Sequence, residues 1–492
     1  MQIEVMFGEY KPDIPSLKGD TQLARNVIPS ELSYRPLPSL SEYGGALDAR
    51  CMGAYAAKSG AGVVTVFAGT ATKLYALTGS SSAWEDVSRT VGGAYAATAR
   101  WNFTQFGDYV QAWNGVDAVQ EFQLGTSTDF AAMSGSPPIA KYATVANQQI
   151  IVGNISGGAS NRLQFCGVDA RTTWGTSATA QSDFSDLVGD GVAIKAVVGR
   201  TTPHIWCERK IFVMTFVGPP TVYDIAEIES QRGTLFPQSV VGYGPFSFGF
   251  CQDGPYSFNG QTLTPIGQGK FADTVMLDFA QSNADRMSAA IDPVNRCVVW
   301  GYPSSDSVDG TPDRMLFFHW PTGKASLCNV THETLTSSAA SFGFTLDQLV
   351  NVSSSLDALP ASLDSDVWTA SGRTLLGAFS TSHKLAYFTG ANLAAKIRTG
   401  EAQIFPGRKS LITRARPLVQ GTDVDMTVTP ITRDKQHVAA STGTAGTVNG
   451  NGFAPLRAKA RYLQADLDIA AGGTWDHAEG IQFEAVPAGA RP

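Results

Sequence analysis

The side chains best suited to hold a metal ion or to attack a substrate are few in this sequence and lie far apart. The histidines are His204, His319, His332, His383, His437 and His477, and the cysteines are Cys51, Cys166, Cys207, Cys251, Cys297 and Cys328. No CxxC pair occurs, and no two histidines have the spacing of a metal-binding face. We therefore interpret the cysteines as small buried apolar residues of a reducing compartment, and the histidines as polar or interfacial residues. We predict no metal site.

Loops that could bind a cofactor or activate a serine are also missing their defining residues. In GQTLTPIGQGKF no Ser or Thr follows Lys270, so the stretch does not satisfy the phosphate-loop pattern, and GYGPFSFG holds only a GxG. His332 and Glu333 in THETL lack the second histidine of a zinc-protease helix, and no GxSxG occurs. We predict no cofactor and no catalytic residues.

Carboxylates leave one enzymatic alternative open. Asp253, Asp292, Asp364 and Asp366 stand in predicted turns, where aspartate side chains accept backbone hydrogen bonds. A fold can still bring two acids from distant turns to the spacing that glycoside hydrolysis needs. A glycan-cleaving protein therefore remains an alternative to the prediction that the chain is not an enzyme.

The charge pattern argues against tight binding of nucleic acid. The chain has 36 basic and 43 acidic residues, a net charge of -7, and no run of Lys or Arg that would neutralise a row of phosphates. A weakly acidic wall would instead let DNA pass without sticking. Charged residues make up 16% of the chain, a low share, which favours a surface partly covered by neighbouring subunits. The N-terminus has no signal-peptide pattern, and no apolar run is long enough for a membrane-spanning helix.

The elements that carry these residues are mostly short strands arranged in a repeat. Pairs of β-type runs with Gly, Asn or Asp turns recur roughly 40 to 60 residues apart, as in the blades of a β-propeller. Asn114-Gly115 suits a tight hairpin turn, and Gly157-Gly158 suits a second turn. The fold is predicted to be mainly β, with a β-propeller of about six or seven blades in residues 48–390. Two β-sandwich domains are the alternative, although they do not explain the regular spacing.

The two flanks differ from the propeller. Residues 1–47 are rich in proline and form an extended N-terminal arm, which must take its order from what it lies against. If the arm latches neighbouring subunits, its deletion should dissolve the assembly and leave the propeller folded. Residues 391–492 alternate apolar and polar positions and are predicted to form a C-terminal β-sandwich-like domain. Short helices are expected near Phe271–Arg286 and Thr345–Leu359.

Several stretches resemble the hub, nozzle and DNA-stabilisation tail proteins of short-tailed bacteriophages. The N-terminal NVIPSELSYRPLPSLS is similar to the opening arm of that family, and FAGTATKLYAL, WEDVSR and WNFTQFGDYVQAWNG follow in the family's order. QSDFSDL, FVGPPTVYDIAEIESQRGTLFPQSVV, QDGPYSFNG with PIGQGK, and IDPVNRCVVWGYP come next. The C-terminal PLRAKARYLQADLDIAAGGTWDHAEGIQFEAVPAGAR resembles the family's closing domain, with Gln464 where the family tends to have a second Arg. Residues 336–367 match no motif of the family and are interpreted as an insertion.

The resemblance implies a structural virion protein. It implies a homo-oligomeric ring, a hexamer, that continues the DNA channel below the portal and adaptor proteins, retains packaged double-stranded DNA, and anchors tail fibres or spikes. Such a protein belongs to the virion tail and is assembled in the cytoplasm of the bacterial host. Two alternatives stay open: a propeller-based glycan-binding or glycan-cleaving protein, and a head-to-tail adaptor or baseplate hub.

Overall fold

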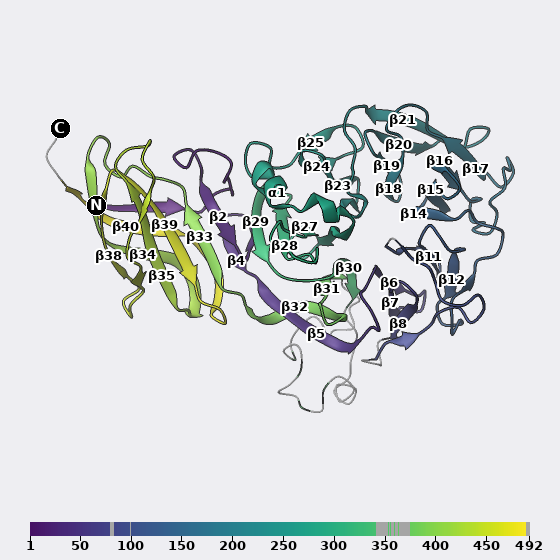
Figure 1. The fold of residues 1–492 in the computed structure, drawn as a ribbon, viewed down its shortest axis with the longest axis horizontal. Coiled ribbons are helices and arrows are strands. Elements are labelled where there is room, and N and C mark those ends of the chain that lie inside the picture. The colour runs from purple at the N-terminus through teal and green to yellow at the C-terminus, as the bar shows by residue number, and fades with distance from the viewer. Residues whose placement is uncertain are drawn as a thin grey trace.

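The structure is a computed structural model that describes residues 1–78, 83–98, 100–340, 353, 355, 359, 363 and 374–488. Most of these residues lie in β-strands. Figure 1 shows a ring of small sheets on one side and a stack of longer strands on the other, with both ends of the drawn chain at the stack. The fold is mainly β, as predicted.

The ring is a β-propeller, because its strands pair in chain order within successive antiparallel four-stranded sets. The first four blades are β6 to β9 (Ala54–Lys58, Val64–Gly69, Leu74–Thr78, Glu85–Asp86), β10 to β13 (Asn102–Phe106, Tyr109–Trp113, Gln120–Gln123, Ala131–Ala132), β14 to β17 (Ala140–Ala146, Gln149–Ile155, Ala159–Phe165, Asp183–Asp186) and β18 to β21 (Ile194–Val198, His204–Cys207, Ile211–Phe216, Tyr223–Glu229). The fifth and sixth are β22 to β25 (Val241–Tyr243, Phe246–Cys251, Gly254–Phe258, Leu263–Pro265) and β26 to β29 (Ser288–Asp292, Cys297–Tyr302, Arg314–His319, Lys324–Asn329).

The seventh blade closes the ring with a strand from the opposite end of the propeller sequence. Its strands are β30 (Thr334–Ala340), β31 (Thr374–Phe379), β32 (Lys384–Asn392) and then β5 (Pro38–Ala46), which pairs antiparallel with β32. The first strand of this blade, β30, lies against β6 of the first blade and β26 of the sixth. Seven blades are thus present in the described part of the chain, within the predicted range, and the alternative of two sandwiches for this region is wrong.

Turn residues shape the hairpins, although not always where the sequence suggested. Gly157 and Gly158, both at positive φ, turn the chain between β15 and β16 as predicted. Asn114-Gly115 is not a two-residue turn: the Asn114 Oδ1 accepts hydrogen bonds from the amides of Val116 and Asp117, and the connection to β12 is longer. A tight turn occurs instead at Asn147-Gln148, where both residues have positive φ.

The second body is a β-sandwich built from both ends of the chain. One sheet contains β1 (Gln2–Met6), β3 (Val27–Pro29), β4 (Tyr34–Pro36), β34 (Lys409–Asp423), β38 (Ala454–Ala460) and β40 (Thr474–Ala488). The other contains β2 (Thr21–Arg25), β33 (Ala395–Thr399), β35 (Met426–Arg433), β36 (Ser441–Thr442), β37 (Gly446–Thr447) and β39 (Tyr462–Ile469). Buried Ile397, Val428, Leu467, Ile481 and Phe483 share one core between them.

The N-terminal arm is ordered by both bodies. Its strand β2 pairs antiparallel with β33 of the sandwich and meets β29 of the sixth blade at Arg25 and Leu327, so one sheet runs from the propeller into the sandwich. Its last strand, β5, is the outer strand of the seventh blade. The structure gives a reason to expect the opposite of the sequence-based prediction that the arm can be deleted with the propeller still folded, because the deletion would remove a blade strand.

In the described residues, helix occurs only in the connections on either side of the fifth blade. The α-helix α1 (Ala272–Asp278) and the 3-10 helix η2 (Gln281–Arg286) occupy the first predicted helical region, and a second 3-10 turn, η1 (Pro237–Ser239), precedes β22. The other predicted helix, Thr345–Leu359, lies outside the described residues apart from three isolated positions. Among the described residues, no helix is both long and apolar enough to span a membrane.

Candidate functional site

Two of the histidines singled out in the sequence, His204 and His332, lie inside the propeller. His204 in the fourth blade is buried, its Nδ1 lies 2.9 Å from the Ser247 hydroxyl, and burial lowers its pKa to about 4. Burial likewise lowers the pKa of His332 to about 4, with its Nδ1 2.9 Å from the Val330 carbonyl oxygen. Both imidazoles are thus neutral at pH 7.

The predicted turn carboxylates accept local hydrogen bonds. Asp292 accepts from the amides of Val294 and Asn295 in the turn after β26, and Asp253 accepts from the Tyr256 hydroxyl at 2.8 Å. These two acids belong to different blades. Asp364 and Asp366 lie outside the described residues.

The cysteines lie inside the fold. All six cysteines are buried and unpaired, as the sequence indicated. In the described ranges, no three His, Cys, Asp or Glu side chains are grouped so that they could hold a metal ion.

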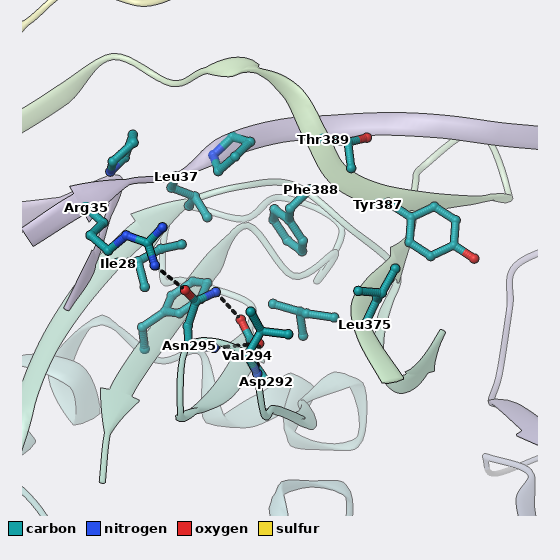
Figure 2. Close-up of a pocket in the computed structure, with 14 residues that line it drawn as sticks. Ile28, Arg35, Leu37, Asp292, Val294, Asn295, Leu375, Tyr387, Phe388 and Thr389 are labelled. Carbon is teal, nitrogen blue, oxygen red and sulfur yellow. Dashed lines mark hydrogen bonds between the residues drawn. The ribbon is translucent and has the colours of Figure 1, made fainter. Parts of the chain in front are cut away.

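One candidate site is the joint where the arm crosses the sixth and seventh blades. A cavity of about 290 Å³ opens there, and Figure 2 shows its lining. The arm contributes Ile28 and Leu37, and the seventh blade contributes Leu376 and Phe388. At the polar rim, Arg35 donates to the Asn295 side-chain oxygen at 3.1 Å, and the Asn295 amide donates to Asp292 at 2.7 Å (Figure 2). The rim fixes the arm to the turn between β26 and β27.

A second contact of the arm completes the helix α1. The residue before this helix, Phe271, offers no capping side chain, which leaves backbone amides of the first turn without acceptors. Asp13 of the arm supplies them: its carboxylate accepts from the amides of Asp273 and Thr274 at 3.0 Å and from the Thr274 hydroxyl at 2.6 Å. An acid near the positive end of the helix dipole is favourable as well. The arm thus caps a propeller helix from about 260 positions away along the chain.

We expect Asp13→Ala to lower the free energy of unfolding by about 1–2 kcal/mol, the usual cost of losing an N-cap. The urea midpoint of the full-length protein measures this. Asp13→Asn retains an acceptor oxygen and should lose less. A change equal for both substitutions would mean that the charge, and not the hydrogen bonds, stabilises the contact.

The sandwich holds the same arm through a buried ion pair. The Arg433 guanidinium binds both carboxylate oxygens of Glu401, and it also donates to the Ser16 hydroxyl of the arm at 3.1 Å. Ser16 donates in turn to Glu401 at 3.0 Å. Because Glu401 is buried, this pair is shielded from water and its planar geometry favours a single arrangement. The arm is therefore fixed at both bodies by polar contacts as well as by strand pairing.

The other candidate site lies at one mouth of the propeller axis. The first strands of the blades surround the axis, and the starts of these strands lie at the same end of the ring. Arg50 precedes β6, Arg100 precedes β10 and Arg286 precedes β26. A polar cavity of about 150 Å³ at this end is lined by Arg100, Gln238 and Thr334 among others.

Sequence reasoning missed these arginines. They are isolated from one another along the chain, so they form no basic run. Their position within the repeat could have revealed them, because Arg100 and Arg286 each stand two residues before the first strand of a blade.

No family model and no curated protein sequence matches this chain. Solved structures with similar folds include the extracellular domain of a putative one-component system from B. thetaiotaomicron, at 8% identity and a TM-score of 0.41, covering 86% of this chain and 58% of that one. The WD40 domain of Neurospora crassa Pan2 has 7% identity and a TM-score of 0.36, covering 68% and 88%. Citrobacter koseri AztD has 11% identity and a TM-score of 0.32, covering 56% and 73%. This chain thus spans just over half of the first of these.

Proposed function

We propose that this chain is a structural protein of a bacteriophage tail, of the hub or nozzle type. In this proposal it forms a ring, a hexamer, that continues the DNA channel below the portal and adaptor proteins, retains packaged DNA and anchors fibres or spikes. The protein then acts by assembly and steric closure, with no catalytic residues. It resides in the virion tail after assembly in the host cytoplasm.

The observation that carries the proposal is the meeting of the two terminal segments whose sequences resemble that family. Tyr34 in the arm motif pairs with Ala478 in the closing motif, and the Ser33 hydroxyl lies 2.7 Å from Nδ1 of His477. Because β2 and β5 of the same arm enter propeller sheets, the propeller and the sandwich are mechanically coupled. Such coupling suits a subunit that must keep its shape under the pressure of packaged DNA.

The axis of the single propeller is not the DNA channel in this proposal. The cavity at its mouth is lined by residues from several blades and measures about 150 Å³. A cavity of this volume is far too small to hold a DNA duplex. The channel would have to be enclosed between subunits of the ring. The net charge of -7 would limit adhesion of passing DNA.

Mass measurement and negative-stain electron microscopy of the purified full chain test the proposal, alone and mixed with portal and adaptor proteins. We expect the chain to form rings with an open centre, or to bind the complex of portal and adaptor proteins and lengthen it. A chain that stays monomeric at all accessible concentrations and does not bind the portal and adaptor proteins would contradict the tail assignment. Genome neighbourhood then separates a nozzle from an adaptor or baseplate hub.

A group of aromatic side chains, Tyr243, Phe246 and Trp320, favours a second candidate function, glycan binding; we call this group the aromatic shelf. Tyr243 and Phe246 are 42% and 45% exposed, and the Tyr243 ring lies 5.0 Å from the ring of Trp320. Aromatic faces of this kind can stack on the apolar face of a sugar. Binding to a panel of bacterial surface polysaccharides, abolished by Tyr243→Ala, would support this function; unchanged binding by that variant would exclude the shelf.

A further inference from the structure

Three arginines meet at the axial mouth without acidic partners at ion-pair distance. In the part of the chain that the structure describes, no carboxylate oxygen lies within 4.0 Å of the guanidinium of Arg50, Arg100 or Arg286. Other arginines of the chain are paired with acids, including Arg89, Arg171 and Arg398. The mouth is thus a local excess of positive charge in a chain that is acidic overall.

Arg100 is the member of this group that lies deepest. Its Nη1 donates to the Thr334 hydroxyl and its Nη2 to the Arg286 carbonyl oxygen at 3.2 Å. Its Nε is buried and has no hydrogen-bond acceptor among the described residues. A guanidinium cannot lose its proton at neutral pH, so an unmatched donor and charge at this depth are costly unless an acceptor reaches them.

The charges around Arg100 raise that cost. Burial and then the charge of Arg50 lower the pKa of Arg100 to about 10, and the charge of Arg286 adds to burial in lowering the pKa of Arg50. Two acids offset part of this repulsion without forming an ion pair with the group. The charge of the exposed Asp285 acts to raise the pKa of Arg50 and of Arg100, and the charge of the buried Glu333 acts to raise the pKa of Arg50. Arg50 therefore repels both Arg100 and Arg286, beside the polar cavity that Arg100 lines.

We propose that the axial mouth binds an oxyanion, a phosphate or carboxylate group, held by Arg100 with Arg50 and Arg286 around it. This inference goes beyond the proposed tail function and does not depend on it. Guanidinium groups match the planar edge of such anions with paired, charge-assisted hydrogen bonds. The cavity of about 150 Å³ that Arg100 lines has room for about five water-sized groups, which is enough for a phosphate or a short carboxylate.

An anion at this position would also join blades that are distant in sequence. The lining residues Ala54, Arg100, Ala289 and Thr334 come from the first, second, sixth and seventh blades, so the site spans the point where the ring closes. A ligand that binds only this closed arrangement stabilises it in proportion to its affinity. The bound oxyanion would thus stabilise the closed ring of blades against unfolding.

Isothermal titration calorimetry of the full chain with inorganic phosphate, and separately with acetate, tests the proposal at low ionic strength. We expect saturable binding of one anion per chain. Removing one charge-assisted hydrogen bond should weaken it about ten- to a hundredfold in Arg100→Gln. Preference for phosphate or for acetate identifies the group; absence of binding for both overturns the proposal.

Matched variants separate the site from general charge effects. Arg296→Gln removes one arginine charge from an exposed residue paired with Glu31, and it should bind the anion like the unmodified chain. If it weakens binding as much as Arg100→Gln, the anion is held by overall charge and the proposal fails. Should Arg100→Gln not fold, Arg50→Gln at the edge of the same group provides the test, with an expected loss in the same direction.

Discussion

A chain that starts at Leu47 is expected to lose cooperative folding of both the propeller and the sandwich. The missing arm supplies β2, β3 and β4 to the sandwich and β5 to the seventh blade. It also carries Phe7, Tyr10, Tyr34, Leu37 and Tyr43, all at most 3% exposed. Burial of a large apolar side chain contributes about 1.5–3 kcal/mol, so five of them contribute about as much as the whole stability of a typical domain, about 5–15 kcal/mol.

Far-UV circular dichroism and urea unfolding of the truncated and full-length chains measure this loss. A shorter deletion of residues 1–6 is the matched control, because it removes only β1, an edge strand with no fully buried residue. That control should keep the fold with a modest fall of the urea midpoint. An unchanged midpoint in the chain that starts at Leu47 would show that the arm is peripheral to both bodies.

Trp300→Ala is expected to lower the free energy of unfolding by about 3–5 kcal/mol, the range for large aromatic residues removed from a packed core. Trp300 on β27 is fully buried, and its ring meets Phe250 of the fifth blade edge to face, with centroids 5.2 Å apart. Its Nε1 donates to the Ser239 carbonyl oxygen at 2.9 Å. The substitution therefore opens a cavity between two blades and leaves a buried acceptor unpaired.

The shift of the urea midpoint at unchanged slope reports this effect. Trp300→Phe keeps part of the packing and loses the hydrogen bond, so it should fall between the unmodified chain and Trp300→Ala. Leu277→Ala removes an aliphatic side chain that is 83% exposed, and it should change stability by no more than about 0.5 kcal/mol. Equal effects at Trp300 and Leu277 would contradict the inter-blade role.

Local chemistry made the repeat of strands predictable. Alternating apolar residues and Gly-rich turns act over a few positions, and each blade is built from consecutive strands, so the hairpins around Gly157-Gly158 follow from neighbouring residues alone. The same locality explains the error at Asn114-Gly115. The Asn114 side chain bonded to the next backbone amides, and a dipeptide preference does not distinguish that turn from a hairpin.

The sequence by itself determined the mainly β fold, the blade spacing and the burial of the cysteines, because these depend on hydrophobic patterning along short segments. Only the tertiary structure decided the partners of the arm and the grouping of charges. Strand β5 pairs with β32, about 340 to 350 positions later, and Asp13 caps α1, through contacts that any exposed strand edge or helix end could have offered. Arg50, Arg100 and Arg286 come together only because closing the ring brings the starts of the inner strands to one mouth.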